Sequence, residues 1–256
     1  MTFNLRFAST RPPNSWPERR PVMRECIERY SPDLIGTQEG LYAQLKDIET
    51  DLPGYATIGL GREGGSKGEF MMIFYRRDRF EPLEYDHFWL SDTPNVISST
   101  SWGNTVKRMV TWVRFMDRRT RQEFYFVNTH FDHQVQVSRE KSAELVRQRV
   151  DALKTTLPVL LVGDFNAVAS ANKAYDILTQ GGGFTDLFKT SPVKRNAEFN
   201  SFTGFKPPVK NGEHIDWLLS RGPVKVSEAE IITFEKNGQT PSDHYPVMVV
   251  VTLGAK

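Results

Sequence analysis

Eight short apolar runs, spread along the whole chain, set the strongest limit on how this sequence can fold. They are rich in β-branched and aromatic residues and are flanked by turn-forming residues: TFNLRF, DLIGTQ, FMMIFYR, KRMVTWVRF, EFYFVNTHF, PVLLVGDF, HIDWLLS and YPVMVVVTL. Runs of this length and composition are typical of β-strands. We therefore expect a chain built mainly from strands, interrupted by a few helices.

The pattern within these runs indicates how some of the strands lie. PVLLVGDF is apolar almost throughout, which predicts a strand covered on both faces. KRMVTWVRF and EFYFVNTHF alternate more between apolar and polar residues and flank the polar stretch MDRRTRQ. These two runs are therefore expected to form a hairpin.

Two segments between the strands carry a helical period instead. In PVMRECIERY, Pro21 is acceptable in the first turn of a helix, and the apolar residues then share one face: Val22, Met23, Cys26, Ile27 and Tyr30. In SREKSAELVRQRVDAL, Ser138 is expected to cap a helix whose apolar stripe contains Val146, Val150 and Leu153. Two sheets packed face to face, with the helices outside, fit these elements best.

Length and composition exclude several classes of protein. The 256 residues suit one domain spanning residues 1–256, and 39% hydrophobic with 25% charged residues is neither a disordered nor a fibrous composition. The net charge of +2 gives no general preference for nucleic acid. The single cysteine, Cys26, excludes an internal disulfide framework and a cysteine-rich zinc site.

The sequence also bears on location. It has no apolar run of about 18 residues, so no membrane-spanning helix is expected. Its first residues, MTFNLRFAST, lack the regions of a signal peptide. The expectation is a cytoplasmic protein, or a secreted or periplasmic one if an upstream leader has been removed.

The polar residues that could carry chemistry lie at or just beyond the ends of the predicted strands, where sites are commonly built. They are Asn4, Glu39, His130, Asp164, Asn166, Asp216, Asp243 and His244. In VGDFN, the alternation of an extended backbone turns Asp164 and Asn166 to the same side, while Phe165 packs inward. The pattern Gly-Asp-x-Asn is also an ordinary structural turn, so this pair alone is weak support for a site.

The oxygen-bearing residues of this set indicate a hard divalent cation. Mg²⁺ is usually held by one or two carboxylates together with water and substrate phosphate, and the available oxygen ligands are Asn4, Glu39, Asp164 and Asp243. Zinc is disfavoured because cysteine ligands are lacking and no histidine pair has helical metal spacing. His130 and His244 lie in segments that already carry carboxylates, which fits general-acid or electrostatic roles near neutral pH.

Each of these residues also has a structural interpretation. Glu39 could cap a helix that begins near Leu41. Asp243 could cap a turn ahead of Pro246, and Asp216 could form an ordinary salt bridge. Structural roles explain single residues well, but they explain poorly why six separated segments all end in groups of the same chemical kind.

The ordered series TFNLR, IGTQE, GEFMMIFYR, VNTHFDH, VGDFN, HIDWLL and SDHYPV resembles the endonuclease/exonuclease/phosphatase superfamily over residues 3–247. Members of that superfamily include pancreatic-type deoxyribonuclease, apurinic-site endonucleases, deadenylases, inositol polyphosphate 5-phosphatases and neutral sphingomyelinases. The resemblance implies a four-layer α/β/β/α sandwich of two packed, mainly antiparallel sheets flanked by helices. It also implies a divalent-metal-dependent hydrolase of phosphate esters, similar to bacterial stand-alone members.

Carried onto matching positions, the resemblance implies a site for Mg²⁺, with Mn²⁺ or Ca²⁺ as substitutes. Glu39 resembles the central metal ligand, with Asn4 and Asp243 beside it. Asp164 resembles the residue that orients or deprotonates the attacking water, and Asn166 resembles the group that holds water or a phosphate oxygen.

Two imidazoles and an arginine complete the implied site. His244 resembles the imidazole that stabilises the pentacovalent phosphate, oriented by Asp216. His130 resembles the imidazole that protonates the leaving oxygen, with Glu69 as its orienting carboxylate, so the carboxylate beside each ring is expected to favour its charged form. Members of the superfamily often keep a phosphate-binding arginine where this chain has Arg108.

The NTHFDH segment extends beyond the common pattern. Its Asp132 and His133 could be further phosphate or metal groups, or only part of a polar loop. The sequence leaves both interpretations open.

The sequence says less about the substrate than about the site. Several aromatic residues are predicted on loops beyond strand ends, where they could stack nucleobases or brace the loops: Phe88, Trp89, Trp102, Phe202 and Phe205. The first hypothesis is a phosphodiesterase or nuclease that acts on nucleic acid by in-line attack of an activated water. The alternatives are a phosphomonoesterase for a small molecule such as an inositol or sugar phosphate, and a non-catalytic binding module. No membrane partner is expected, and the chain is expected to be a monomer.

Overall fold

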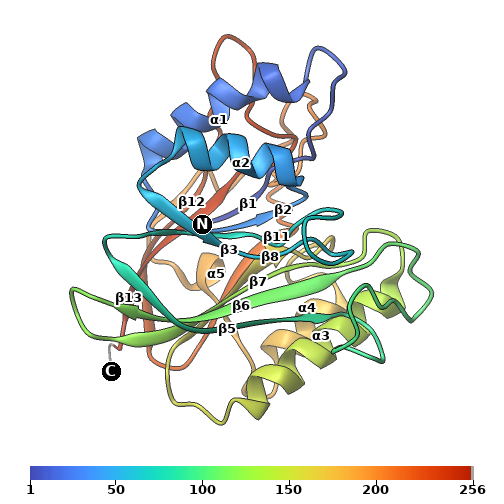
Figure 1. Ribbon diagram of the computed structural model, residues 1–256. Coiled ribbons are helices and arrows are strands. Elements are labelled where there is room, and N and C mark those ends of the chain that lie inside the picture. Colours follow the sequence, from blue (N-terminus) through green and yellow to red (C-terminus); the bar gives the residue numbers. More distant parts are fainter. Residues whose placement is uncertain (255–256) are drawn as a thin grey trace.

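Two β-sheets pack face to face between two layers of helices in this protein, as the computed structural model of the chain shows for residues 1–254 (Figure 1). One sheet contains, in spatial order, β10 (Lys194–Arg195), β12 (Val224–Ile231), β13 (Val247–Leu253), β1 (Thr2–Asn4), β2 (Leu34–Gln38), β4 (Ile73–Arg76) and β3 (Tyr55–Ile58). The other contains β5 (Phe80–Trp89), β6 (Met109–Asp117), β7 (Glu123–His130), β8 (Val159–Asp164), β11 (Asp216–Arg221) and β9 (Thr185–Asp186).

The strand pairing is mainly antiparallel. Parallel pairs occur between β1 and β2, between β7 and β8, and between β10 and β12. The helices α1 (Trp16–Tyr30) and α2 (Tyr42–Asp51) cover the outer face of the first sheet, and α3 (Gln136–Ala152) and α4 (Lys173–Thr179) cover the outer face of the second, while α5 (Leu187–Thr190) is a single short turn (Figure 1). The predicted α/β/β/α sandwich is confirmed.

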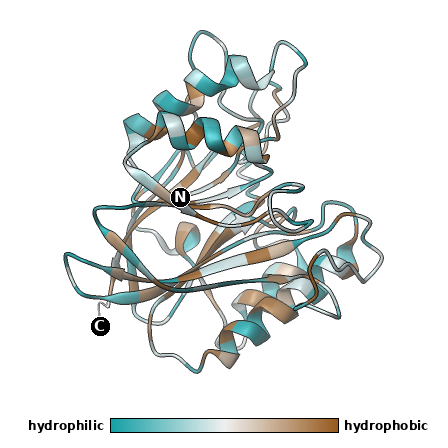
Figure 2. Ribbon diagram, in the orientation of Figure 1, coloured by the Kyte–Doolittle hydropathy of each residue, from teal (hydrophilic) through white to brown (hydrophobic). Residues whose placement is uncertain are grey.

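Three apolar cores hold the four layers together. One lies between α1 and α2 and the first sheet, one between the two sheets, and one between the second sheet and α3 and α4. Strand β8 contributes Leu161 to the outer core and Val162 to the central core, so it is buried on both faces as its nearly continuous apolar run predicts. Figure 2 shows brown, hydrophobic stretches along the strands of both sheets and mostly hydrophilic colours on the outer turns of α1 and α2.

The hairpin predicted around MDRRTRQ is present. Strands β6 and β7 pair in antiparallel register from Val110 opposite Thr129 to Met116 opposite Glu123. At the turn, the Asp117 N–H donates to the Gln122 carbonyl at 2.9 Å. Successive side chains point to opposite faces, so β6 alternates between buried and partly exposed residues from Val113 on, whereas β7 is buried on both faces, with Phe124 in the central core and Tyr125 in the outer one.

Both predicted helices begin earlier than the sequence suggested. Helix α1 begins at Trp16, so Pro21 lies inside it, and the Glu18 carboxylate accepts the N–H of Ser15 at 2.9 Å. Helix α3 begins at Gln136, so Ser138 is a buried residue of the helix and not its cap. The preceding turn is held by Asp132, whose Oδ1 accepts the N–H of Val135 at 2.7 Å.

The strand register brings the predicted polar residues to one edge of the sandwich. In the parallel pair β1–β2, Asn4 lies opposite Gln38, which places Asn4 beside the end of β2 where Glu39 follows. In the second sheet, Asp164 lies between His130 of β7 and Asp216 of β11. The carboxyl ends of four strands and the amino end of β11 therefore meet at the same edge.

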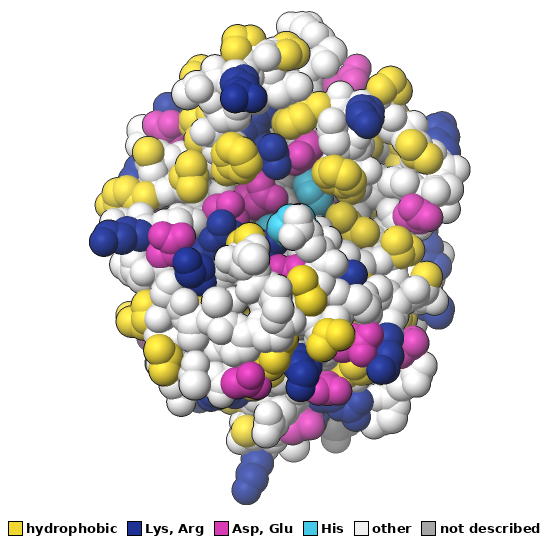
Figure 3. Space-filling view, turned by 90° about the vertical axis from the view of Figure 1, so that its right-hand side faces the viewer, with side chains coloured by type: hydrophobic (Ala, Val, Ile, Leu, Met, Phe, Trp, Pro, Cys, Tyr) yellow, Lys and Arg dark blue, Asp and Glu magenta, His cyan; other side chains and the backbone are white. Residues whose placement is uncertain are grey.

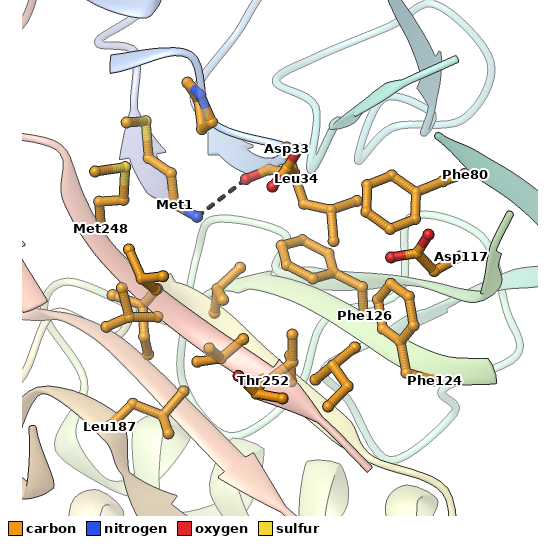
Figure 4. A pocket seen from close by; sticks show the side chains of 18 of the residues that line it. Met1, Asp33, Leu34, Phe80, Asp117, Phe124, Phe126, Leu187, Met248 and Thr252 are labelled. Carbon is orange, nitrogen blue, oxygen red and sulfur yellow. Dashed lines mark hydrogen bonds between the residues drawn. The ribbon is translucent and has the colours of Figure 1, made fainter. Parts of the chain in front are cut away.

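A separate apolar cavity of about 450 Å³ lies between the sheets, toward the opposite ends of these strands. Figure 4 shows its walls, which include Phe124 and Phe126 of β7 together with Leu34, and the Met1 nitrogen donates to the Leu34 carbonyl at 3.0 Å. None of the predicted site residues lines it. Within residues 1–254, no helix combines the length and apolar character that crossing a membrane requires.

Candidate active site

Asp164 is the residue around which the predicted site is assembled. Its side chain is only 1% exposed, at the end of β8. The Oδ2 atom accepts a hydrogen bond from Asn4 Nδ2 at 2.9 Å and lies 3.4 Å from His130 Nε2 and 3.8 Å from His244 Nε2. Figure 3 shows histidine and acidic side chains gathered in a hollow near the middle of one face of the molecule. This carboxylate therefore joins groups from both sheets at the floor of a pit.

His244 is held by the carboxylate that the sequence predicted for it. Its Nδ1 lies 2.9 Å from Asp216 Oδ2, and its backbone N–H donates to Ser242 Oγ at 3.2 Å. Asp216 is fixed in turn through its N–H, which donates to Ser201 Oγ at 3.3 Å. Burial by itself lowers the pKa of His244, but Asp216, followed by Asp164, outweighs it and raises this pKa to about 10. The ring is therefore an imidazolium at neutral pH.

The electrostatics of Asp164 suit a proton acceptor. Burial, followed by the neighbouring charge of Asp216, raises the pKa of Asp164 to about 7, and His244 opposes that rise. The backbone N–H of Asn166 donates to Oδ1 of Asp164 at 2.9 Å, which fixes the orientation of the carboxylate. A carboxylate whose pKa lies near neutrality accepts a proton from water more readily than an exposed aspartate does.

His130 differs from the prediction in both its partner and its charge. The expected hydrogen bond with Glu69 is not formed, because the Glu69 carboxylate pairs with Arg62 NH1 at 2.6 Å. Burial, followed by the charges of Arg108 and Arg62, lowers the pKa of His130 well below its usual value, so the ring is neutral. Its Nε2 lies 3.0 Å from Asn166 Nδ2, and within the described part of the chain its Nδ1 has no hydrogen-bond partner.

Two of the predicted site residues lie in the left-handed backbone region, which non-glycine residues rarely adopt. The φ angle is 62° at Glu39, directly after β2, and 49° at Asn166, two residues after the end of β8. Such conformations cluster at functional sites, where the surrounding structure holds them. Here they turn the chain sharply at the end of β2 and beyond β8, so neither residue continues its strand.

Glu39 and Asp243 supply hard oxygen ligands on one side of the pit. Both carboxylates face Arg6, at 3.8 Å from Glu39 Oε2 and 3.7 Å from Asp243 Oδ2. Burial, opposed mainly by the charge of His244, raises the pKa of Asp243. Two carboxylates with one loosely paired, partly exposed arginine between them match the donor set that Mg²⁺ uses with water and phosphate.

Asn4 has a different place from the ligand position that the resemblance implies. Its Nδ2 donates to Glu39 Oε1 at 3.0 Å as well as to Asp164 Oδ2, and its Oδ1 accepts the N–H of Arg6 at 2.9 Å. In this arrangement the amide turns its N–H groups to the two carboxylates and its oxygen to the backbone. Asn4 therefore orients Glu39 and Asp164.

A second set of groups has the composition of a metal site, namely Asp164, Asp216 and His244, whose ligand atoms lie within 4.8 Å of one another. In this set His244 Nδ1 is already engaged by Asp216, and His244 is charged at neutral pH. A protonated imidazole cannot ligate a metal. Glu39 and Asp243 fit a hard cation better, and the Asp216–His244–Asp164 chain fits proton handling.

Arg108 is the most buried cation on the other side of the pit. It is only 4% exposed, and its NH2 lies 3.1 Å from His133 Nδ1. Its Nε and NH1 have no hydrogen-bond partner among residues 1–254. Burial lowers the pKa of Arg108, although Glu69 opposes this. Buried donors without acceptors are costly, so this arginine suits a place where an anion arrives.

The groups beyond the common motif have structural and supporting positions. Asp132 holds the turn before α3 through hydrogen bonds with two backbone N–H groups, and His133 contacts Arg108. None of Arg6, Arg62, Ser201 and Ser242 was predicted from the sequence, and the two serines hold the backbone N–H groups of Asp216 and His244. Ser242 had a signal, since it lies within the SDHYPV motif, whereas Arg62 lies in a glycine-rich loop without one.

Most of the aromatic residues predicted as stacking surfaces are used inside the protein. Trp89 is 3% exposed and donates its Nε1–H to the Arg62 carbonyl at 2.7 Å. Phe88 is buried, and Trp102 donates to Asp92. Phe202 is 46% exposed and its ring lies 4.9 Å from that of His244, so it is the aromatic side chain of this group that borders the pit most openly.

Fold and site together define a phosphoester hydrolase built on an α/β/β/α sandwich, with buried carboxylates and imidazoles at one edge of the sheets. The family model of the Endonuclease/Exonuclease/phosphatase family matches residues 1–244. The chain belongs to this family.

Three relatives indicate how close the likeness is. An endonuclease/exonuclease/phosphatase from Bacteroides vulgatus is 32% identical, with a TM-score of 0.93 and coverage of 98% of this chain and 97% of that one. The mannosyl-6-phosphatase from Bacteroides thetaiotaomicron is 34% identical, with a TM-score of 0.92 and coverage of 98% of both chains. An uncharacterized protein of Acanthamoeba polyphaga mimivirus is 27% identical and is matched over 92% of this chain and 91% of its own length.

Proposed function

We propose that this chain is a divalent-metal-dependent phosphomonoesterase that acts on a small phosphorylated molecule, of which a sugar phosphate is the best example. The observation that carries the proposal is the arrangement at Asp164, where a buried carboxylate with a pKa raised to about 7 lies between two imidazoles and is tied through Asn4 to Glu39. The arrangement supports the proposal because it brings a proton acceptor, hydrogen-bond donors and hard oxygen ligands close together.

Each residue of the pit has a defined task in an in-line hydrolysis. Asp164 accepts the proton of the attacking water, and the Asn166 side chain, which lies beside His130, holds the water or a phosphate oxygen. His244, charged through its contact with Asp216, stabilises the charge that develops on the phosphate oxygens and has a proton to give to the leaving oxygen.

The remaining groups bind and neutralise the substrate. Neutral His130 contributes a hydrogen bond, and Arg108 offers its unpartnered N–H groups to the phosphate. Glu39 and Asp243 would hold Mg²⁺, or Mn²⁺ or Ca²⁺ in its place, with Asn4 orienting Glu39. When bound, this metal supplies a Lewis acid that draws charge from the phosphate.

A monoester is favoured over a diester for two reasons. The phosphate of a monoester carries more negative charge, and the buried cations Arg108 and His244 lie around the pit. The relative named as a mannosyl-6-phosphatase is 34% identical over 98% of this chain. The phosphodiesterase that the motifs first suggested remains the second candidate, supported by the exposed ring of Phe202 beside His244.

A substrate panel separates these functions. Release of phosphate is measured from mannose 6-phosphate and from glycerol phosphate, and cleavage is measured with bis-p-nitrophenyl phosphate and single-stranded DNA, each with Mg²⁺ and with EDTA. We expect the monoesters to be hydrolysed in the presence of Mg²⁺ only. Faster turnover of the two diesters would replace the proposal with the second candidate, and activity that EDTA does not reduce would remove the metal.

A further inference from the structure

The guanidinium of Arg19 lies beneath the acidic side of the pit with every one of its N–H groups engaged. Arg19 is on α1 and its side chain is 0% exposed. A guanidinium has five N–H donors, and all of the hydrogen bonds here go to backbone carbonyls, those of Leu5, Arg6, Phe7, Asn14 and Pro241 at 2.8–3.1 Å.

Four of these five carbonyls belong to the two segments that carry the predicted metal site. Leu5, Arg6 and Phe7 directly follow Asn4, and Pro241 comes two residues before Asp243. The first of these segments holds Glu39 directly, because the N–H of Phe7 donates to Glu39 Oε2 at 3.3 Å. One side chain therefore joins the loop after β1 to the loop before β13.

The conformation of the loop after β1 depends on these hydrogen bonds. Arg6 lies in the left-handed backbone region with a φ of 51°, a conformation that persists only where the surroundings hold it. Its carbonyl accepts from Arg19 NH2 at 3.1 Å and from Gln44 Nε2 at 3.0 Å. If Arg19 released these carbonyls, the segment that orients Glu39 would be free to relax.

The charge of Arg19 also faces the site. Among the described residues no carboxylate forms a salt bridge with Arg19, but the charges of Asp243 and Glu39 raise its pKa and so favour its charged form. Burial lowers the pKa of Arg19 to about 10, which still leaves the guanidinium charged at neutral pH. Its flat face is covered by Trp16 at 5.6 Å and Phe205 at 5.8 Å, which exclude water from it.

We propose that Arg19 is a positioning residue for the metal site: it binds carbonyls on the loop after β1, which holds Glu39, and on the loop that carries Asp243, and it thereby sets the distance between these two carboxylates and the affinity for a divalent metal. The inference rests on the proposed metal site. Groups that orient metal ligands from behind typically change metal affinity by about 10–100-fold when they are removed.

The test compares two conservative substitutions at buried or partly buried arginines that bind carbonyls. Arg19→Lys keeps the charge but loses the planar fork that reaches both loops. Arg147→Lys is the matched control, because Arg147 also donates to three carbonyls, those of Ile177, Gln180 and Gly181, between α3 and α4 and away from the pit. Mg²⁺ and Mn²⁺ are titrated into each protein by calorimetry, without substrate, and Tm is recorded.

We expect Arg19→Lys to bind both metals about tenfold more weakly than the wild-type protein, and Arg147→Lys to lower Tm with unchanged metal affinity. In kinetics, Arg19→Lys should need more Mg²⁺ for half-maximal activity and regain most of kcat when Mg²⁺ is saturating. Unchanged metal affinity in Arg19→Lys, with only a lower Tm, would overturn the inference.

A second variant covers the case in which Arg19→Lys does not fold. Gln44→Met removes the hydrogen bond from Nε2 to the Arg6 carbonyl on the same loop, together with the one that Oε1 accepts from the Leu41 N–H at 3.3 Å. This variant should bind the metal about threefold more weakly, since one of several hydrogen bonds to the loop after β1 is lost. Wild-type affinity in this variant would again refute the role of that loop in metal binding. A wild-type protein that binds neither metal would overturn the metal site itself and this inference with it.

Discussion

Replacing Asp216 by asparagine should shift the proton affinity of His244 and, with it, the pH range in which the protein is active. The substitution is nearly isosteric and leaves the backbone N–H that donates to Ser201 Oγ in place. It removes the negative charge 2.9 Å from His244 Nδ1, which is the main influence that raises the pKa of this ring. Burial, which lowers that pKa, is then opposed only by the charges of Asp164 and Asp243.

The size of the effect follows from the two states of the ring. His244 has a pKa of about 10 in the folded protein instead of the usual 6.5, and a difference of this order is a preference of about 3–5 kcal/mol for the charged form. Without Asp216 the pKa is expected to fall to about 6.5 or lower, so at about pH 8.5 only about 1% of the rings stay protonated. The activity that needs the imidazolium should fall by about 100-fold at that pH and much less at about pH 6.

Two assays check this prediction. The first is the pH profile of kcat/KM for phosphate release from a sugar phosphate, in which the alkaline limb should move from about pH 10 to below about pH 7. The second is the titration of the His244 Cε1–H signal by NMR, which is independent of catalysis. A His244 signal that titrates at the same pH in the variant and in the wild-type protein would refute the electrostatic reasoning, even if activity were lost.

Three further predictions concern the metal, the base and stability. Glu39→Gln should weaken Mg²⁺ binding by at least about tenfold in a calorimetric titration, and an unchanged affinity would remove Glu39 from the metal site. Wild-type kcat/KM should rise with pH through about 7, because Asp164 must lose its proton to act as a base and burial raises its pKa; a profile that is flat from pH 5 to 8 would contradict this. Burial lowers the pKa of His87 to about 4, so folding stability is lost as pH falls from the ordinary value of 6.5 toward 4. The free energy of unfolding in urea should fall between about pH 7 and pH 5 in the wild-type protein, and this fall should be about 1–2 kcal/mol smaller in His87→Gln. An equal fall in both proteins would exclude His87 as a cause.

The parts of the fold that the sequence predicted are those set by local pattern. The continuous apolar run of β8 and the alternation of β6 reflect which faces each strand buries, so they are visible without the rest of the chain, whereas β7 is buried on both faces. The ends of these strands carry Asp164 and His130, and the register of the sheets then brings the two together. The start of α1 was also visible in principle, since Ser15 and Glu18 have the spacing of a capping box.

The parts that were missed depend on contacts between distant segments. His130 lacks its expected partner because Arg62 takes the Glu69 carboxylate, and Arg62 is placed by a loop that contains Gly64 and Gly68 in the left-handed region. Arg19 and Arg20 are neighbours of the same type, yet Arg19 is buried against five carbonyls while Arg20 pairs with Asp51 at the surface of α2. Only the packing of α1 on the loops around the pit distinguishes them.

The most direct test of the account is phosphate release by the wild-type protein beside Asp164→Asn, with Asp186→Asn as control. Asp186 is also a buried aspartate, but its Oδ1 accepts the Lys189 N–H at the start of α5, away from the pit. We expect release from mannose 6-phosphate by the wild-type protein and by Asp186→Asn, abolished by EDTA and restored by Mg²⁺. Asp164→Asn should be folded and at least about 100-fold slower in kcat, with KM little changed. If Asp164→Asn kept more than about a tenth of the wild-type kcat, the buried carboxylate between the two imidazoles would not be the catalytic base.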